Sequence, residues 1–477
     1  MTESYVSFKG TNGDSPSHIP EDLLHFIQRD TYSLLIKGFA GTGKTTLALT
    51  ILNVLGIKKN NFFYISTRIS PKQLFQYYPW LKDLIGQSKQ PRGTSLARDH
   101  EVMSSFEDAR LDEPESLFER ITNQLMDIKS PIIIIDSWDA IASFMDREAR
   151  LNNERVLQTW RERAGAKLIF ISEQPADTTL DFLVDGIVEL KQSYYNNVKM
   201  REIFLQKLRG TRIKRPSYLY TLENSIFHSF APYQPIKFEP LKSGAVEVSE
   251  LSTGDNIGSG YPMLDASLGS GFPRKGLVLL ELDSHVNMTI AMIFLQRIVS
   301  NFVSNGNPVL LQSVNWIEPS SILRFFETFL PAGKKSLFKI LWTGKPYKIS
   351  NNIISPSKNE NSDQLLAALV KMKQRHRDKL LLNIMWTEAI QSLHRARKLR
   401  NGMKNVLSRI MAHADLSIAV LTPSQADILE LVSELSNIHL RFMIINDTLF
   451  LQSLVPSSNL YSLIFDRQSQ MSLKAVV

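Results

Sequence analysis

The stretch Gly38-Phe-Ala-Gly41-Thr42-Gly43-Lys44-Thr45 fits the phosphate-loop pattern G-x-x-x-x-G-K-[ST] without a mismatch. It stands between an apolar run of strand length, 33–37, and an apolar run of helical length, 46–54. Glycines in such a loop let successive backbone N–H groups surround a phosphate, and the N-terminus of the following helix adds positive potential. A glycine-rich turn that matches by chance is the alternative, and the flanking strand and helix argue against it.

Each residue type in this loop has an expected role. Lys44 is expected to contact the β- and γ-phosphates of a nucleotide, and the Thr45 hydroxyl is expected to bind Mg²⁺. ATP and Mg²⁺ are therefore the predicted ligands. The predicted nucleotide-binding residues of the loop are Gly38, Ala40, Gly41, Thr42, Gly43, Lys44, Thr45 and Thr46.

A second stretch, Ile132-Ile-Ile-Ile135-Asp136, has four apolar residues that end in a carboxylate. In a phosphate-loop protein an aspartate at the end of such a strand holds the magnesium hydration shell opposite the loop threonine. Taken alone, a buried strand whose aspartate caps the next helix would be the simpler interpretation. Together with the loop upstream, the pattern predicts Thr45 and Asp136 as the metal ligands.

Short apolar runs of strand length recur along the chain, with helical or polar stretches between them. Continuous rather than alternating apolarity is typical of strands buried on both faces, which indicates mainly parallel α/β sheets. We expect a flexible leader at 1–19, an ATP-binding domain at 20–229, a linker at 230–249 and a second α/β domain at 250–477. The runs lie at 33–37, 61–66, 131–136, 167–172 and 186–190, then at 277–282, 308–314, 379–386 and 417–422, and finally at 439–445, 448–453 and 461–465.

The composition of the 477 residues excludes several classes of protein. With 43% hydrophobic and 21% charged residues the chain is an ordinary folded protein, and it has no cysteine for disulfides or thiolate metal sites. No apolar run has the length of a membrane helix, and the first residues lack the pattern of a signal peptide. A cytoplasmic location without a membrane partner is therefore expected.

The net charge of +8 is unevenly distributed: residues 1–240 hold 30 basic and 29 acidic residues, and residues 241–477 hold 25 and 18. A solvated face is the simpler interpretation, but an anionic partner of the second half, nucleic acid included, stays possible. No helix-turn-helix, zinc or RNA-binding motif supports sequence-specific reading. The basic residues of two clusters are Lys371, Lys373, Arg375, Arg377 and Lys379, then Arg395, Arg397, Lys398, Arg400 and Lys404.

These motifs, with the pair Asp136-Ser137, the strand end Ile171-Ser-Glu173 and the run Gln206-Lys-Leu-Arg-Gly-Thr211, resemble the RecA/RadA/KaiC group of P-loop ATPases. The glycine-rich stretch 252–276 resembles the opening segment of a second KaiC-like domain. The resemblance implies two tandem RecA/KaiC-like domains. More narrowly, the stretches 32–38, 64–71 and 208–222 are similar to the archaeal gas-vesicle regulator family of the D type, a GvpD-like P-loop protein.

The second domain has lost its phosphate loop. Alignment of its opening segment places Leu282 and Asn287 at glycine positions and Met288 at the lysine position, and Asp283 adds a negative charge. A side chain at a glycine position blocks the approach of the backbone to a phosphate. This domain is therefore predicted to be a degenerate pseudo-ATPase that does not bind ATP, and that either supports the first domain by packing or offers a surface to a partner.

The same resemblance bears on catalysis. Where the KaiC type has two glutamates before Ser-Pro, this chain has Arg68 and Ile69, and arginine stays protonated and cannot act as a base. Arg68 is instead predicted to bind the γ-phosphate. Asp139 and Glu173 are the carboxylates that could replace the missing pair, with helix capping or a plain surface charge as the alternative for each.

Lys207 and Arg209 are similar to the Lys-x-Arg that KaiC-like subunits extend to the γ-phosphate of a neighbour, which implies self-association. The predicted function is an ATP-binding regulatory protein with slow or partner-dependent hydrolysis, a switch for a protein partner and at most a weak ATPase. A DNA-stimulated RecA/RadA-like ATPase is the alternative. An autophosphorylating clock-type ATPase would need an intact second domain. The predicted catalytic residues are Glu173, Asp139, Lys207 and Arg209.

Overall fold

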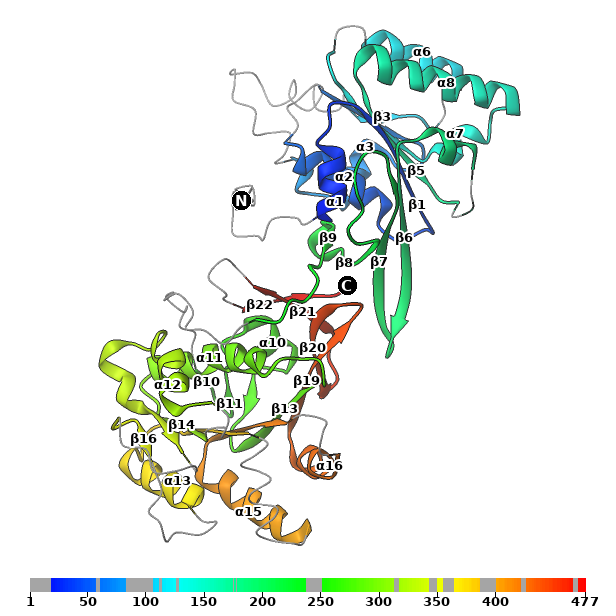
Figure 1. Ribbon diagram of the computed structural model, residues 1–477. Helices are drawn as coiled ribbons and strands as arrows, with labels where there is room; N and C mark the ends of the chain where they lie inside the picture. The colour runs from blue at the N-terminus through cyan, green and yellow to red at the C-terminus, as the bar shows by residue number, and fades with distance from the viewer. Residues whose placement is uncertain are drawn as a thin grey trace. The chain divides into compact units, whose positions relative to one another are not determined.

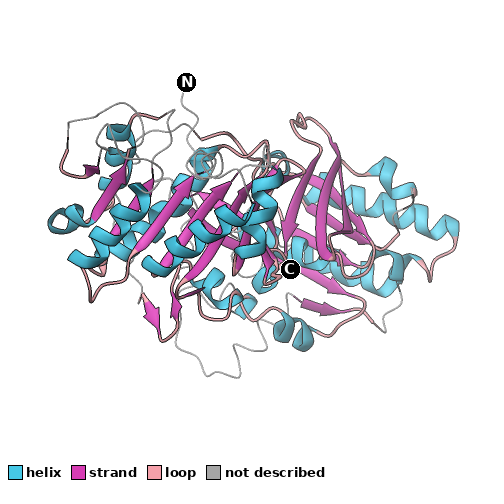
Figure 2. Cartoon of the chain, turned by 90° about the horizontal axis from the view of Figure 1, so that it is seen from below, coloured by secondary structure: helices cyan, strands magenta, loops and turns pink. Residues whose placement is uncertain are grey.

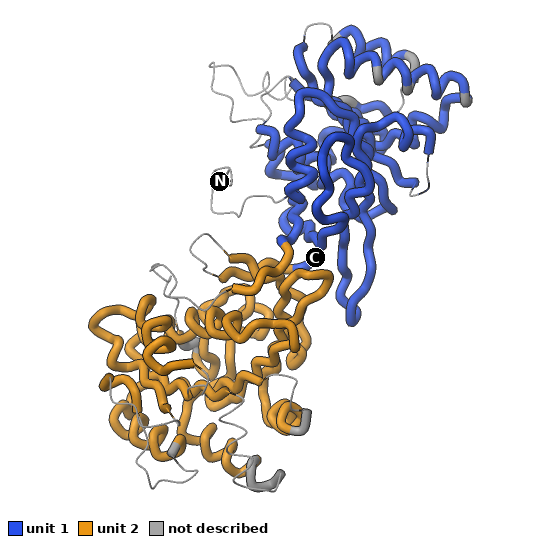
Figure 3. The backbone as a smooth tube through the Cα atoms, viewed as in Figure 1, with its two compact units in different colours: residues 1–231, 476–477 blue, residues 232–475 orange. Residues whose placement is uncertain are grey.

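A computed structural model gives the fold (Figure 1). The chain divides into two compact units: unit 1 comprises residues 1–231 and 476–477, and unit 2 comprises residues 232–475 (Figure 3). Residues 1–18 of the predicted leader and much of the predicted linker lie outside the described residues. The structure describes residues 19–56, 61–82, 106–110, 114–125, 128–174, 176, 178–236, 251–312, 317–342, 350–354, 364–386, 400–421, 426–465 and 471–477.

The sheet of unit 1 has, among the described residues, the strand order β3-β2-β4-β5-β1-β6-β7-β8-β9. Its strands from β3 to β6 run parallel, and β6 to β9 continue antiparallel. The strands are β1 (Tyr32–Gly38), β2 (Phe62–Ser66), β3 (Phe106–Asp108), β4 (Ile132–Asp136), β5 (Lys167–Ser172), β6 (Gly186–Tyr195), β7 (Val198–Leu208), β8 (Ser217–Thr221) and β9 (His228–Ser229).

Helices cover both faces of this sheet (Figure 2). Every residue of β1 is buried, and its side chains alternate: Leu34 and Ile36 join the core under α1 and α2, whereas Leu35 joins the core under α6, α7 and α8. The predicted burial on both faces is thus confirmed. The helices are α1 (Glu21–Ile27), α2 (Lys44–Val54), α3 (Pro71–Tyr77), α6 (Pro114–Leu125), α7 (Trp138–Ala142), α8 (Arg147–Ala164), α9 (Thr179–Leu183) and the 3-10 turn η1 (Glu223–Ser225).

The main sheet of unit 2 repeats this order. In its described part the order is β16-β15-β14-β17-β18-β13-β19-β20-β21-β22, so β13 lies between β18 and β19 as β1 lies between β5 and β6. Its strands are β13 (Gly276–Leu282), β14 (Val309–Gln312), β15 (Phe338–Leu341), β16 (Ile353–Ile354), β17 (Leu382–Trp386), β18 (Leu416–Leu421), β19 (Ile438–Ile445), β20 (Thr448–Val455), β21 (Leu460–Phe465) and β22 (Met471–Ala475).

The predicted fold class is confirmed, because both units are α/β with large, mainly parallel sheets. Two details differ from the expectation. The strand expected at 379–386 begins only at Leu382, and several strands, among them β7 and β8 inside the unit 1 sheet and β22 at the end of the unit 2 sheet, had no predicted counterpart. The remaining elements of unit 2 are the small sheet β10 (Ser252–Thr253), β11 (Asn256–Ile257) and β12 (Phe272–Pro273), with α10 (Pro262–Ser267), α11 (Met288–Ser304), α12 (Pro319–Glu327), η2 (Ala332–Leu337), α13 (Gln364–Arg375), α15 (Arg400–His413) and α16 (Ala426–Leu435).

In the basic cluster at 371–379, Lys373 is half-buried, and the other four basic residues are exposed, as a solvated face requires. Lys373 Nζ donates to the Oδ2 atom of Asp415, which is 1% exposed, at 2.5 Å and to the Lys379 carbonyl oxygen at 2.7 Å. Lys373 is therefore part of the fold of unit 2. Residues 395–398 of the second cluster lie outside the described residues. In the described part of the chain, no helix combines the length and the apolar character that a membrane span requires.

One buried ion pair lies directly before the phosphate loop. Lys37 Nζ, on β1, donates to Asp181 Oδ1 on α9 at 2.6 Å, with side-chain exposures of 1% and 9%. Asp181 Oδ2 also accepts hydrogen bonds from the backbone N–H and the hydroxyl of Thr178. Burial alone would raise the pKa of Asp181, but the hydrogen bonds from Lys37 and Thr178 outweigh it and lower the pKa.

We expect Asp181→Asn to destabilise the full chain by about 3–5 kcal/mol, because it removes a carboxylate that forms a buried ion pair with the Lys37 ammonium. Asp108→Asn, which breaks an exposed pair with Arg110, is the matched control and should leave the stability almost unchanged. Because the Asp181 pKa is lower in the folded state, its contribution should be lost in the unmodified chain as the pH falls below about 4. Urea unfolding at several pH values measures both effects, and equal losses in the two variants would contradict the assignment.

Candidate functional site

The carboxyl ends of four parallel strands lie next to one another at one edge of the unit 1 sheet. In the strand register, Ser66 of β2 pairs with Asp136 of β4, and Ser172 of β5 pairs with Lys37 of β1. Residues that follow these strands are therefore brought together at this edge. They are the phosphate loop after β1, Arg68 after β2, Asp136 at the end of β4 and Glu173 after β5.

The phosphate loop depends on glycines at two close approaches. A Cβ atom at Gly38 would lie 2.5 Å from the Leu190 carbonyl oxygen, and one at Gly43 would lie 2.6 Å from Leu222 Cδ1. Gly43 also has a φ of 94°, in the region that only glycine adopts readily. Both positions therefore exclude other residues, as the motif requires.

Lys44 begins α2 and bends back over the loop. Its Nζ atom donates to the carbonyl oxygens of Gly38 at 2.7 Å and Phe39 at 2.9 Å. Burial lowers the Lys44 pKa, the carboxylates of Glu173 and Asp136 act in the opposite direction, and Arg68 acts in the same direction as burial. The ammonium group thus lies within the field of the charged residues at this edge.

Asp136 connects the loop to the centre of the sheet. Its Oδ2 atom accepts hydrogen bonds from Thr45 Oγ1 at 2.6 Å and from the Tyr64 hydroxyl at 2.5 Å. Burial raises the pKa of Tyr64, and the Asp136 carboxylate raises it further, so Tyr64 remains a hydrogen-bond donor. A hydroxyl and a carboxylate at this distance are oxygen ligands of the kind that Mg²⁺ prefers, so the two predicted metal ligands fit the ion.

The turn after β2 is attached to the same aspartate through its backbone. The Thr67 N–H donates to the Asp136 carbonyl oxygen at 2.8 Å, and the Ser137 N–H donates to Thr67 Oγ1 at 2.9 Å. The Ile69 N–H donates to Ser66 Oγ at 3.2 Å. These contacts place Arg68 on a turn whose backbone is held on both sides.

Arg68 and Glu173, which the sequence places in separate roles, contact each other. Arg68 donates from both terminal nitrogens to the two carboxylate oxygens of Glu173, each at 2.5 Å. The Arg68 side chain is 52% exposed and that of Glu173 is 29% exposed. This bidentate pair joins the ends of β2 and β5 across the end of β4.

Asp139 lies on α7, and both of its carboxylate oxygens contact the end of β5. Oδ2 accepts the Glu173 N–H at 2.6 Å, and Oδ1 accepts the Ser172 hydroxyl at 3.1 Å. Asp139 therefore fixes the backbone position of Glu173. This contact was not foreseen from the sequence, because it depends on the adjacency of β4 and β5.

Lys207 and Arg209 lie away from the phosphate loop of their own unit. Lys207 pairs with Ile187 on β6, level with Leu35 of β1 and before the loop begins. Lys207 Nζ donates to the Asp181 carbonyl oxygen at 2.9 Å. Arg209 lies 3.5 Å from Asp185 and donates to the Phe182 carbonyl oxygen. Both cations thus contact α9 and the residues after it.

The antiparallel edge supplies residues that sequence reasoning missed. The Tyr220 hydroxyl, on β8, donates to the Thr42 carbonyl oxygen of the loop at 2.5 Å, and the ring stacks on Phe227 with centroids 4.4 Å apart. The Phe227 N–H donates to Thr50 Oγ1 on α2 at 3.1 Å. No local sequence pattern indicates Tyr220 and Phe227, because they contact the loop and α2 only through the antiparallel arrangement of β6 to β9.

The equivalent edge of unit 2 has a different chemistry. The strand register places Trp386 of β17 where Asp136 stands in unit 1, and Leu282 is buried where the first loop glycine would stand. Glu281 Oε2 lies 2.8 Å from His439 Nε2, and Arg441 Nε donates to Asp283 Oδ1 at 2.7 Å. The charged groups of this edge are therefore paired among themselves.

Comparison with known proteins finds a family match within unit 1 and longer matches to individual relatives. Residues 24–206 match the family model of the GvpD gas vesicle protein, P-loop domain. Protein GvpD2 and Protein GvpD1 of Halobacterium salinarum are 24% and 26% identical over 304 residues each, or 61% and 60% of this chain. The circadian clock oscillator protein KaiC of Thermostichus vulcanus is 24% identical over 307 residues, or 60% of this chain.

The matched stretches span 60%, 54% and 53% of the lengths of these three relatives. The predicted resemblance to GvpD-like and KaiC-like P-loop proteins is thereby confirmed at modest identity. The agreement concerns the type of domain. The roles of individual residues rest on the geometry described above.

We expect Tyr220→Phe to weaken ATP binding about fivefold, because the buried Thr42 carbonyl loses its partner and the loop becomes less ordered, at a cost of about 1 kcal/mol. Tyr218→Phe is the matched control, since Tyr218 lies on the same strand with its ring beside Arg215. Fluorescence titration with a labelled ATP analogue measures both. Unchanged affinity in Tyr220→Phe would show that the loop does not depend on β8.

Proposed function

We propose that this GvpD- and KaiC-like P-loop protein binds one Mg-ATP at the phosphate loop of unit 1. We further propose that the bound nucleotide acts as a switch for a protein partner, with slow or partner-dependent hydrolysis. The observation that carries the proposal is the contact of Thr45 Oγ1 with Asp136 Oδ2 at 2.6 Å, beside a lysine that bends over the glycine loop.

The loop residues would bind the nucleotide with little rearrangement. Backbone N–H groups of residues 41–46 would surround the β-phosphate, and Lys44 Nζ would exchange the Gly38 and Phe39 carbonyl oxygens for phosphate oxygens. Thr45 and Asp136, whose oxygen atoms are in contact, would hold the metal. Mg²⁺ would supply neutralisation of the charge on the β- and γ-phosphates.

The residues expected around the γ-phosphate support slow hydrolysis. Arg68 stands at the turn where a general base would be expected, and its guanidinium cannot accept a proton. Asp139 already uses both oxygens on the end of β5, so we propose that it positions Glu173 rather than acting on water. Glu173 remains the candidate for orienting water, and its carboxylate is occupied by Arg68.

A switch needs contacts that differ between nucleotide states. Arg68 is the residue whose partner would change, because a phosphate can accept the same two hydrogen bonds as the Glu173 carboxylate. Lys207 and Arg209 lie away from their own loop, so we propose that they act on nucleotide only across a subunit contact in a self-assembled form. Their positions beside α9 support this without fixing the number of subunits.

For unit 2 we propose support of unit 1 or partner contact, without nucleotide. Leu282 in place of the first glycine and Trp386 in place of Asp136 remove the loop and the metal ligand. A DNA-stimulated ATPase, the alternative from the sequence, gains no support from the relatives found or from the described residues. We therefore do not propose nucleic acid as the partner.

We expect the unmodified chain to bind one ATP per chain, and Lys44→Ala to bind none while it unfolds at the same temperature within a few degrees. The loss follows because the main positive charge of the loop is removed. Lys72→Ala, an exposed lysine on α3, is the matched control and should bind normally. Isothermal titration calorimetry measures stoichiometry and affinity. Micromolar affinity in Lys44→Ala, or two ATP molecules per unmodified chain, would contradict the proposal.

A further inference from the structure

We propose that the Arg68–Glu173 ion pair is a latch that distinguishes ATP from ADP. The latch is closed without nucleotide and with ADP, and the γ-phosphate of ATP opens it by giving Arg68 a second anionic partner. This inference rests on the proposed binding of Mg-ATP at the unit 1 loop. It adds that the ion pair stays closed with ADP, so that only the third phosphate releases the Glu173 carboxylate.

The strand order places the latch across the phosphate site. β4 lies between β2 and β5, so a contact from Arg68 to Glu173 passes over the end of β4, where Asp136 stands. Glu173 follows Ser172, which pairs with Lys37, and it is therefore level with Gly38, the first residue of the loop. A γ-phosphate held by Lys44 and by a metal at Thr45 and Asp136 would lie at the same edge as the ion pair.

The backbone on each side of the latch is held, and the side chains are accessible. Thr67 is bonded to Asp136 and Ser137, and Ser70 begins α3 with a capping box to Gln73. On the other side, the Glu173 N–H is bonded to Asp139. Because the Arg68 side chain is half exposed, it can turn to a new partner without a large desolvation cost.

Both members of the pair lie close enough to Lys44 for their charges to influence it. Besides burial, the charges that influence the Lys44 pKa are those of Glu173, Asp136, Arg68 and Asp139. A γ-phosphate beside Lys44 would attract the Arg68 guanidinium and repel the Glu173 carboxylate. Guanidinium binds a phosphate through the same two parallel hydrogen bonds that it makes to a carboxylate, so the exchange preserves its geometry.

The consequence is that only the ATP state leaves Glu173 without its arginine. In that state the carboxylate lies beside the γ-phosphate, where it can orient water or contact a partner. ADP has no γ-phosphate, so with ADP bound the ion pair between Arg68 and Glu173 stays formed. The chain can therefore bind both nucleotides at one loop and still present different charges at the sheet edge.

A double-mutant cycle tests the latch on the full chain. Arg68→Gln, Glu173→Gln and the double variant are titrated with ADP and with a non-hydrolysable ATP analogue, both with Mg²⁺. Arg68→Gln should lower the affinity for the ATP analogue about tenfold, because a charged hydrogen-bond donor to the γ-phosphate is lost. Its affinity for ADP should stay within about twofold of that of the unmodified chain. Glu173→Gln should raise the affinity for the ATP analogue about threefold or more, and this gain should be clearly smaller in the double variant, where Arg68 is absent.

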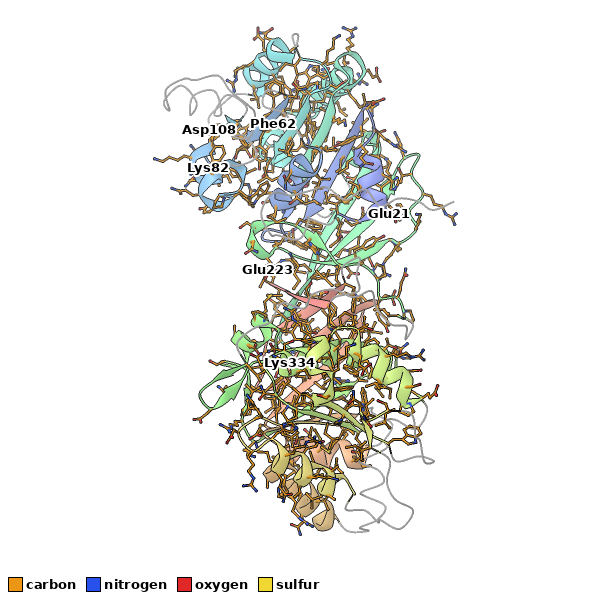
Figure 4. The ribbon with its side chains drawn as sticks, turned by 90° about the vertical axis from the view of Figure 1, so that its left-hand side faces the viewer. Glu21, Phe62, Lys82, Asp108, Glu223 and Lys334 are labelled. Carbon is orange, nitrogen blue, oxygen red and sulfur yellow. The ribbon has the colours of Figure 1, made fainter. Side chains whose placement is uncertain are left out.

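Arg110→Gln is the matched control. Arg110 makes the same kind of exposed, two-pronged contact with Asp108, which is labelled in Figure 4 and ends β3 on the far side of β2 from the loop. This variant should bind both nucleotides as the unmodified chain does. Arg68→Lys keeps the charge but loses the two parallel hydrogen bonds. Its affinity for the ATP analogue should therefore lie between those of Arg68→Gln and the unmodified chain, whereas its affinity for ADP should not change.

Two results would overturn the latch alone. An equal loss of affinity for ADP and for the ATP analogue in Arg68→Gln would show that Arg68 does not contact the γ-phosphate. An equal gain from Glu173→Gln with and without Arg68 would show that Glu173 acts on the phosphate directly and not through the pair. Absence of Lys44-dependent binding in the unmodified chain would instead overturn the proposed function, and the latch with it.

Discussion

The hydrogen bond from Thr45 Oγ1 to Asp136 Oδ2 joins the start of α2 to the end of β4, and the rest of the site depends on it. Tyr64 donates to the same carboxylate, and Thr67 donates to the carbonyl oxygen of the same residue. One aspartate therefore sets the positions of the phosphate loop, of β2 and of the turn that carries Arg68. This arrangement is possible because β1, β2 and β4 run parallel and end at one edge.

The two units show how little of this fold depends on phosphate chemistry. They share their strand order, yet a buried lysine paired with Asp181 precedes the loop in unit 1, and a buried glutamate beside His439 occupies the equivalent place in unit 2. Apolar runs that are buried on both faces specify the sheets in both. The side chains at the carboxyl edge can therefore differ, with a glycine loop in unit 1 and mutually paired charges in unit 2, without loss of the architecture.

The sequence was sufficient to predict the α/β class, the loop and Asp136, because each is a local pattern with a mechanism behind it. It predicted Arg68 and Glu173 as site residues but not their contact, which joins residues 105 positions apart across a third strand. The role of Asp139 and the contact of Tyr220 with Thr42 depend in the same way on strand order and on the return of β8. The strand expected from residue 379 begins late because pattern alone does not separate its start from the preceding loop.

The central claim is that unit 1 holds ATP with contacts suited to sensing its phosphates rather than to fast turnover. Single-turnover hydrolysis, measured with Mg²⁺ and excess protein over a range of protein concentrations, tests it most directly. The account predicts tight binding with a rate far below the usual range of about 1–10³ s⁻¹ for enzymes. Hydrolysis within that range, by the chain alone and at low protein concentration, would contradict it.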